Sequence, residues 1–221
     1  MSSISPIGFN QDITNFFNSR SASSTNSNNL LNIVSGETSL ATISSMGQQI
    51  NNLYSLVQSS GDKDAINGFK TAMLSMGSDM GNMRSVNFFN NMENMSYTDK
   101  KNFNKVFSTL NELNKNSLDG QVNNFIDTFN NAVDKFGTKD MGDFLDTMKN
   151  LIEKTAGGDR LKANSTLFSF LNTYNDILNS ENLKKNDKET IASKFLKDID
   201  SRETITSINQ YIKDFKSNNS I

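Results

Sequence analysis

Carboxylates are the strongest candidates for catalysis in this sequence, because the chain contains no His and no Cys. Histidine is the usual general base and the commonest metal ligand, so triads built on Ser–His or Cys–His are impossible within this chain. Without cysteine, disulfides and thiolate metal sites are excluded as well. The main chemistry that remains is hydrolysis of glycosides by a pair of carboxyl groups.

Closely spaced carboxylates occur at Asp140, Asp143 and Asp146, at Asp198, Asp200 and Glu203, and at Glu181. All of them lie among charges that are typical of solvated helix faces and helix starts. The chain also has no Trp, so a sugar-binding cleft would lack its usual stacking platform. We therefore expect a protein that is not an enzyme and that holds no cofactor and no metal ion.

An Asp/Glu-dependent hydrolase is the less favoured alternative. It requires a cleft with two carboxylates about 5–9.5 Å apart, one of them with a raised pKa.

The overall charge and hydropathy narrow the classes of partner. A net charge of −2 offers no general attraction to a phosphate backbone, so we expect no nucleic acid partner. No apolar run exceeds three residues, which predicts no membrane span. The N-terminus also lacks the basic region and apolar stretch of a cleaved signal peptide. Protein partners are the class that remains.

The segment MLSMGSDMGNM is the most distinctive local pattern in the chain. Methionines at helical spacing can form a surface that adapts to several partners, because the side chain is flexible and polarizable. The alternative is a buried Met-rich helix weakened by two glycines. As tentative partner-binding residues we single out Met73, Met76, Gly77, Met80, Gly81 and Met83.

The elements that would position these residues are helices. Apolar residues recur at intervals of three and four, and no run alternates with period two for long. The pattern predicts an all-α protein, an irregular multi-helix bundle of about eight or nine helices. The stripes span 40–57, 66–83, 88–95, 103–113, 122–136, 141–152, 161–178, 191–199 and 205–215. Gly61, Gly137 and Gly157 lie just past three of these stripes, where a left-handed cap would end a helix.

One phrase recurs along the chain: FIDTFNN from Phe125, FLDTMKN from Phe144 and FLNTYND from Phe170. It could be a degenerate repeat, or it could be how each amphipathic helix buries a Phe against its neighbours. The spacing between successive copies is not constant, as a solenoid would require. We favour core packing, and whether these helices are true repeats stays open.

Charge divides the chain into two parts. Residues 1–60 carry only Asp12, Arg20 and Glu37, whereas charges are frequent from Gly61 onward. The stretch RSASSTNSNN from Arg20 has no large apolar residue to offset the entropy of ordering it. We predict a flexible Ser/Asn-rich N-terminal arm at 1–35 and a helical bundle domain at 36–221.

The opening MSSISPIGFNQDITNFFNSRSASSTNSNN resembles the Ser/Asn-rich start of bacterial flagellar and type III export substrates. The resemblance covers about the first 30 residues. It implies a bacterial structural or protein–protein interaction protein, exported without a cleaved signal peptide and associated with the cell surface or the flagellum. A homo-oligomer is one option.

The alternative is a cytoplasmic helical adaptor or chaperone whose groove holds an amphipathic helix of another protein. The sequence does not identify the partner, the oligomeric state or the biological process.

Overall fold

The computed structural model describes residues 37–77 and 82–219, and in this part it contains nine α-helices and no strand. The all-α prediction is confirmed. The helices are α3 (Glu37–Ser59), α4 (Lys63–Met76), α5 (Met83–Thr98), α6 (Lys100–Lys115), α7 (Val122–Phe136), α8 (Gly142–Thr155), α9 (Arg160–Asn179), α10 (Lys185–Asp200) and α11 (Ile205–Asn219). The predicted arm, residues 1–35, lies outside the described residues.

The chain divides into two compact units, residues 1–47 and 48–221, and the division falls inside α3. Of the first unit, only the helical residues 37–47 are described. The second unit contains the rest of α3 and all of α4 to α11.

Side-chain caps and glycines set many of the helix ends. Asp62 and Asp159 each accept two backbone N–H bonds in the first turn of α4 and α9, which satisfies donors that the helix itself leaves free. Gly137 follows α7 with φ of 92° and donates its N–H to the carbonyl of Val133, as predicted for a glycine that ends a helix.

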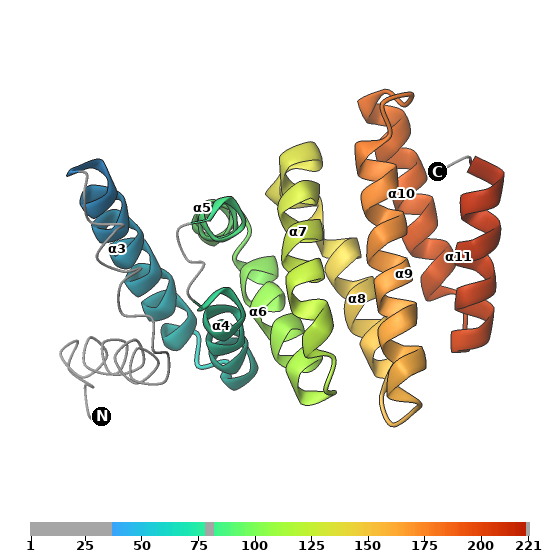
Figure 1. Cartoon of the computed structure of the whole chain (residues 1–221), viewed down its shortest axis with the longest axis horizontal. Helices are drawn as coiled ribbons and strands as arrows, with labels where there is room; N and C mark the ends of the chain where they lie inside the picture. Colours follow the sequence, from blue (N-terminus) through green and yellow to red (C-terminus); the bar gives the residue numbers. More distant parts are fainter. Residues whose placement is uncertain (1–36, 78–81, 220–221) are drawn as a thin grey trace. The chain divides into compact units, whose positions relative to one another are not determined.

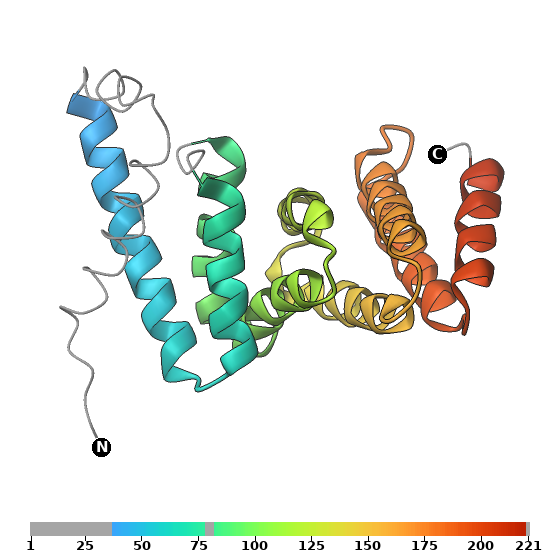
Figure 2. The ribbon, with the colours of Figure 1, turned by 60° about the horizontal axis from the view of Figure 1, so that its bottom comes forward.

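The helices of the second unit alternate between two layers. From α4 to α9, each helix packs on the helix two positions further along the chain, so that α4, α6, α8 and α10 form one layer and α5, α7, α9 and α11 form the other. Figures 1 and 2 show these helices following one another in chain order. This i to i+2 packing is what stacked helical pairs produce.

Contacts between aromatic rings run through the core from α3 to α11. Successive ring centroids lie 4.9–6.4 Å apart along a path through Tyr54, Phe69, Phe107, Phe88, Phe129, Phe125, Phe144, Phe170, Phe195 and Phe215. The three Phe residues that open the recurring phrase are all fully buried. The phrase therefore serves packing, as the sequence analysis favoured.

A polar residue recurs within this apolar interior. Thr109, Thr128 and Thr147 follow one another at intervals of 19 residues in α6, α7 and α8, and all three are buried. Thr109 and Thr128 each donate their hydroxyl to the carbonyl four residues earlier, which satisfies the hydroxyl within its own helix. The three helices therefore share one pattern of buried positions.

Polar bridges join every pair of helices that pack within a layer. In the first layer they are Asp64–Lys115 (α4–α6), Lys105–Asp146 (α6–α8) and Thr147–Asp200 (α8–α10). In the second layer they are Arg84–Asp127 (α5–α7), Asn131–Asn175 (α7–α9) and Asp176–Lys216 (α9–α11). Each bridge pairs one particular residue of a helix with one residue of the next helix in the same layer, and therefore agrees with a single register between them.

Candidate functional site

The predicted Met-rich surface is divided between two helices. The helix α4 ends at Met76, where Gly77 takes a φ of 45° and donates its N–H to the carbonyl of Met73. A new helix, α5, begins at Met83 after the cap residue Asn82. The prediction of one continuous helical stripe over 66–83 is therefore wrong, because a glycine with positive φ ends α4 at Met76.

The methionines also differ in exposure. The side chains of Met73 and Met76 are buried in the core, whereas Met83 is 77% exposed. Met80 and Gly81 lie outside the described residues. A buried side chain cannot contact a partner unless its helix moves, so Met83 is the described methionine of this set that is available at the surface. The partner role of the set stays a prediction.

Several of the carboxylates considered for catalysis make contacts between helices. Asp146 accepts from the Lys105 ammonium at 2.6 Å, and Asp200 accepts from the Thr147 hydroxyl at 2.8 Å. Asp198 accepts from the Tyr211 hydroxyl, also at 2.8 Å. Asp146 lies on α8, whereas Asp198 and Asp200 both lie on α10, and each of the three carboxylates pairs with a side chain of another helix. Within 37–77 and 82–219, no group of three or more acidic side chains is placed to hold a metal ion.

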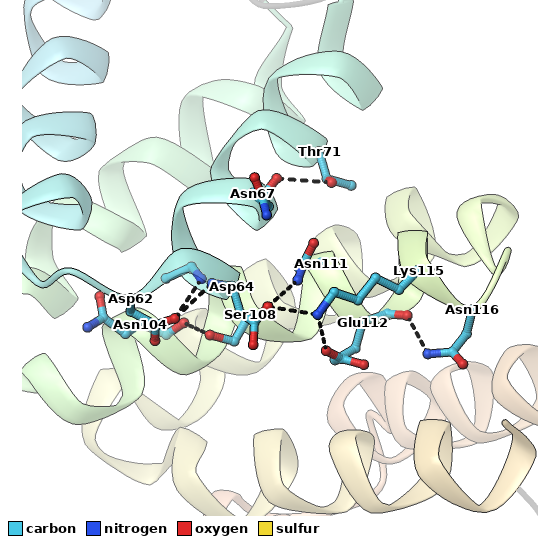
Figure 3. Close-up of polar contacts among 11 residues, drawn as sticks. Asp62, Asp64, Asn67, Thr71, Asn104, Ser108, Asn111, Glu112, Lys115 and Asn116 are labelled. Carbon is cyan, nitrogen blue, oxygen red and sulfur yellow. Dashed lines mark hydrogen bonds and ion pairs between the residues drawn. The ribbon is translucent and has the colours of Figure 1, made fainter.

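Figure 3 shows a polar cluster that joins the start of α4 to the second half of α6. The Asp64 carboxylate accepts from the Asn111 amide at 2.9 Å and from the Lys115 ammonium at 2.7 Å. The hydrogen bond of Lys115 to Asp64, and then a second one to Glu112, raises the pKa of Lys115. The carboxylate is thus held by two donors of α6, and the cluster ties the two helices together.

A shallow hollow of about 330 Å³ lies between α7, α8, α9 and α10. Its apolar lining comes from Phe136, Tyr174, Ala192 and Leu196. Asp143, in the first turn of α8, and Glu189, on α10, also line it, and both are exposed. It is a site for one side chain or a small group, with acidic neighbours.

A few large apolar side chains lie on the surface of the described residues. They are Leu56, Leu74, Met83, Tyr97, Leu161 and Phe168. Leu161 and Phe168 both belong to α9 and fall within the apolar stripe predicted over 161–178. They lie seven residues apart on one helix face, whereas the buried positions 163, 167, 170, 171 and 174 belong to a different phase of the same helix. That difference in helical phase could have shown, from the sequence, that Leu161 and Phe168 do not belong to the buried face of α9.

None of the described helices combines the length and the hydropathy that crossing a membrane requires. Comparisons of the chain with protein-family models, with curated proteins and with solved structures find no match. What the described residues define is a class of architecture, an all-α protein of stacked helices tied by polar bridges.

Proposed function

We propose that this chain is a non-enzymatic structural or protein–protein interaction protein of a bacterium. The observation that carries the proposal is the two-layer stacking of α4 to α11. In such a stack every helix buries one face against its neighbours and presents another, so successive helices build a long, continuous surface.

The polar bridges support the same proposal. A surface that is held rigid before binding loses less conformational entropy when a partner docks. The Arg84–Asp127 pair illustrates this: two parallel bonds, at 2.6 and 2.7 Å, fix the guanidinium against the carboxylate across α5 and α7. An exposed pair contributes little stability, but two parallel bonds restrict the orientation of the guanidinium more than a single bond would.

Export to the cell surface or flagellum is the second part of the proposal, and it rests on the resemblance of the N-terminal residues. The test is to follow the intact protein in cells and in culture supernatant, with and without a working type III export apparatus. Full-length protein outside the cell only when the apparatus works would support the proposal.

Protein retained inside the cell in both strains would contradict export. The alternative would then be a cytoplasmic helical adaptor. The hollow between α7 and α10 favours this second candidate, since it can receive one side chain of a partner helix.

A further inference from the structure

Two features on the surface of the second unit carry opposite charge. The first is Leu161 with its neighbours Arg160 and Lys162, which we call the basic knob. The second is the hollow lined by Phe136, Tyr174, Ala192 and Leu196 together with Asp143 and Glu189, which we call the acidic hollow. Besides the opposite charges, the apolar side chains that the two features present are the exposed Leu161 and the partly buried Phe136.

The basic knob is held in a defined position. Leu161 is 82% exposed, the highest value among the large apolar side chains described. Arg160 and Lys162 are also exposed. The knob forms the first turn of α9, where the Asp159 carboxylate accepts the N–H groups of Leu161 at 2.9 Å and Lys162 at 3.3 Å. That cap fixes the backbone and engages the carboxylate of the residue that precedes the knob.

The acidic hollow has the opposite character. Tyr174, Ala192 and Leu196 are buried, so little of each side chain is open to the hollow, and the charged residues that line it are both acidic. Glu189 has a cation nearby, Lys185, at 3.8 Å, but that pair is exposed and therefore weak. Lys194 and Lys197 do not line this hollow; they line a neighbouring one, which shares Glu189 and Ser193 with it.

A chain cannot place its own knob in its own hollow. Leu161 and Tyr174 lie thirteen residues apart on the single helix α9, which holds them about 20 Å from each other at 1.5 Å per residue. Only another molecule can bring the two features together.

We propose that the basic knob of one copy of this chain docks in the acidic hollow of a second copy. Leu161 would cover the apolar lining, while Arg160 and Lys162 would pair with Asp143 and Glu189. Because two different surfaces meet, each copy can bind one neighbour at its knob and another at its hollow, and assembly continues unless the copies close into a ring. This inference rests on the proposed function, because it names a second copy of the chain as the partner of the proposed interaction protein.

The test uses the full chain and measures its weight-average mass by sedimentation equilibrium over rising protein concentration. The wild type should exceed the mass of one chain as concentration rises. Arg160→Glu with Lys162→Glu should weaken association at least about tenfold, because acidic groups then face acidic groups. Asp143→Asn with Glu189→Lys changes the acidic hollow instead, and this variant should also associate at least about tenfold more weakly.

Mixing the two variants is the decisive step. The acidic knob of the first variant then meets the basic hollow of the second, and the basic knob of the second meets the acidic hollow of the first. The mixture should recover association that neither variant shows alone. Lys100→Glu with Lys101→Glu, two exposed cations in the first turn of α6, is the matched control and should associate like the wild type.

The apolar contribution is tested with Leu161→Ser against Tyr97→Ser, a similarly exposed side chain on α5. Leu161→Ser should weaken association, whereas Tyr97→Ser should leave it unchanged. Circular dichroism of each variant checks that it is folded.

The proposal is overturned if the wild type stays monomeric up to about 1 mM, the weak end of specific affinities. It is also overturned if association persists in the knob variant, or if mixing restores nothing. A monomeric protein that is still exported would leave the structural role standing with a different partner. Self-association of a protein retained in the cell would contradict export alone.

Discussion

At the scale of single residues, Gly68 lies where α4 meets α6 with no side chain between the two backbones. A Cβ placed on Gly68 would lie 1.6 Å from the carbonyl oxygen of Phe107. No rotamer change can relieve that contact, because the obstructing atom belongs to the main chain of a packed helix. The close approach of these helices therefore depends on glycine at this position.

Gly68→Ala is expected to lower the free energy of unfolding by about 3 kcal/mol or more, at or above the usual cost of overpacking. Urea denaturation followed by circular dichroism measures the change. Gly47→Ala is the matched control, since a Cβ there meets nothing within 4 Å. Because Gly47 lies inside a helix, Gly47→Ala should instead raise the free energy of unfolding by up to about 1 kcal/mol. Equal effects of the two substitutions would contradict the close approach.

Tyr211 gives a pH-dependent prediction at the same scale. Its hydroxyl donates to Asp198, and the Arg202 guanidinium lies 3.8 Å from its ring centroid. Burial, and then the hydrogen bond to Asp198, raises the pKa of the phenol, although Arg202 lowers it slightly. Because the pKa is higher in the folded state, the stabilisation is complete below the unfolded pKa of about 10 and is lost as pH rises above it.

Tyr211→Phe should therefore cost about 1 kcal/mol near neutral pH, the value of one hydrogen bond. The difference from the wild type should shrink above pH 10. Chemical denaturation of both proteins between pH 7 and pH 11 measures this. A difference that stays constant or grows over that range would show that ionisation of Tyr211 is not coupled to folding.

At the scale of elements, neighbouring helices of one layer are held together by buried amides. In the α5–α7 contact, the Asn91 side-chain NH₂ donates to the Asn130 side-chain oxygen at 3.1 Å. The Asn130 NH₂ in turn donates to the carbonyl of Arg84 at 3.0 Å. Both side chains are buried, so removing one leaves polar groups of the other helix without these partners.

Asn130→Ala is expected to destabilise by about 2 kcal/mol, the cost of leaving buried polar groups unpaired. The double substitution with Asn91→Ala should cost less than the two single changes added, because both remove the same contact. A double-mutant cycle from urea denaturation tests this. Asn114→Ala, exposed on α6, should change stability by less than about 0.5 kcal/mol. If the free-energy costs of Asn91→Ala and Asn130→Ala simply add in the double variant, the two side chains are not coupled.

At the scale of the whole molecule, the second unit is a stack in which each helix contacts near neighbours only. A central helix such as α7 or α8 packs on both sides, whereas α11 packs in its layer on α9 alone. Stability in such arrays varies along the chain, and the ends open at lower free energy than the middle.

Hydrogen exchange followed by mass spectrometry should therefore show the strongest protection in α7 and α8 and weaker protection in α11. Phe215→Ala, which removes a buried ring of α11, should speed exchange in α10 and α11 while leaving α4 and α6 nearly unchanged. Uniform acceleration along the whole unit would show a single cooperative domain instead.

The sequence by itself determined the helical class, most of the core and several helix ends. Intervals of three and four place Phe125, Phe144 and Phe170 on buried faces, and Gly137 ends a helix where its position predicts. These properties are local: a periodic stripe and a cap depend on residues within a few positions of one another, so they can be recognised from the order of amino acids.

Only the tertiary structure decided which helix lies against which. The same Phe pattern allows an irregular bundle or a stack, and the i to i+2 packing appears only when residues far apart in sequence meet. Gly68 carries no local sign that its Cβ position is occupied by the backbone of Phe107. The basic knob and the acidic hollow likewise depend on how α7, α8, α9 and α10 come together, because exposure and shape are properties of packed surfaces and periodicity is a property of one helix.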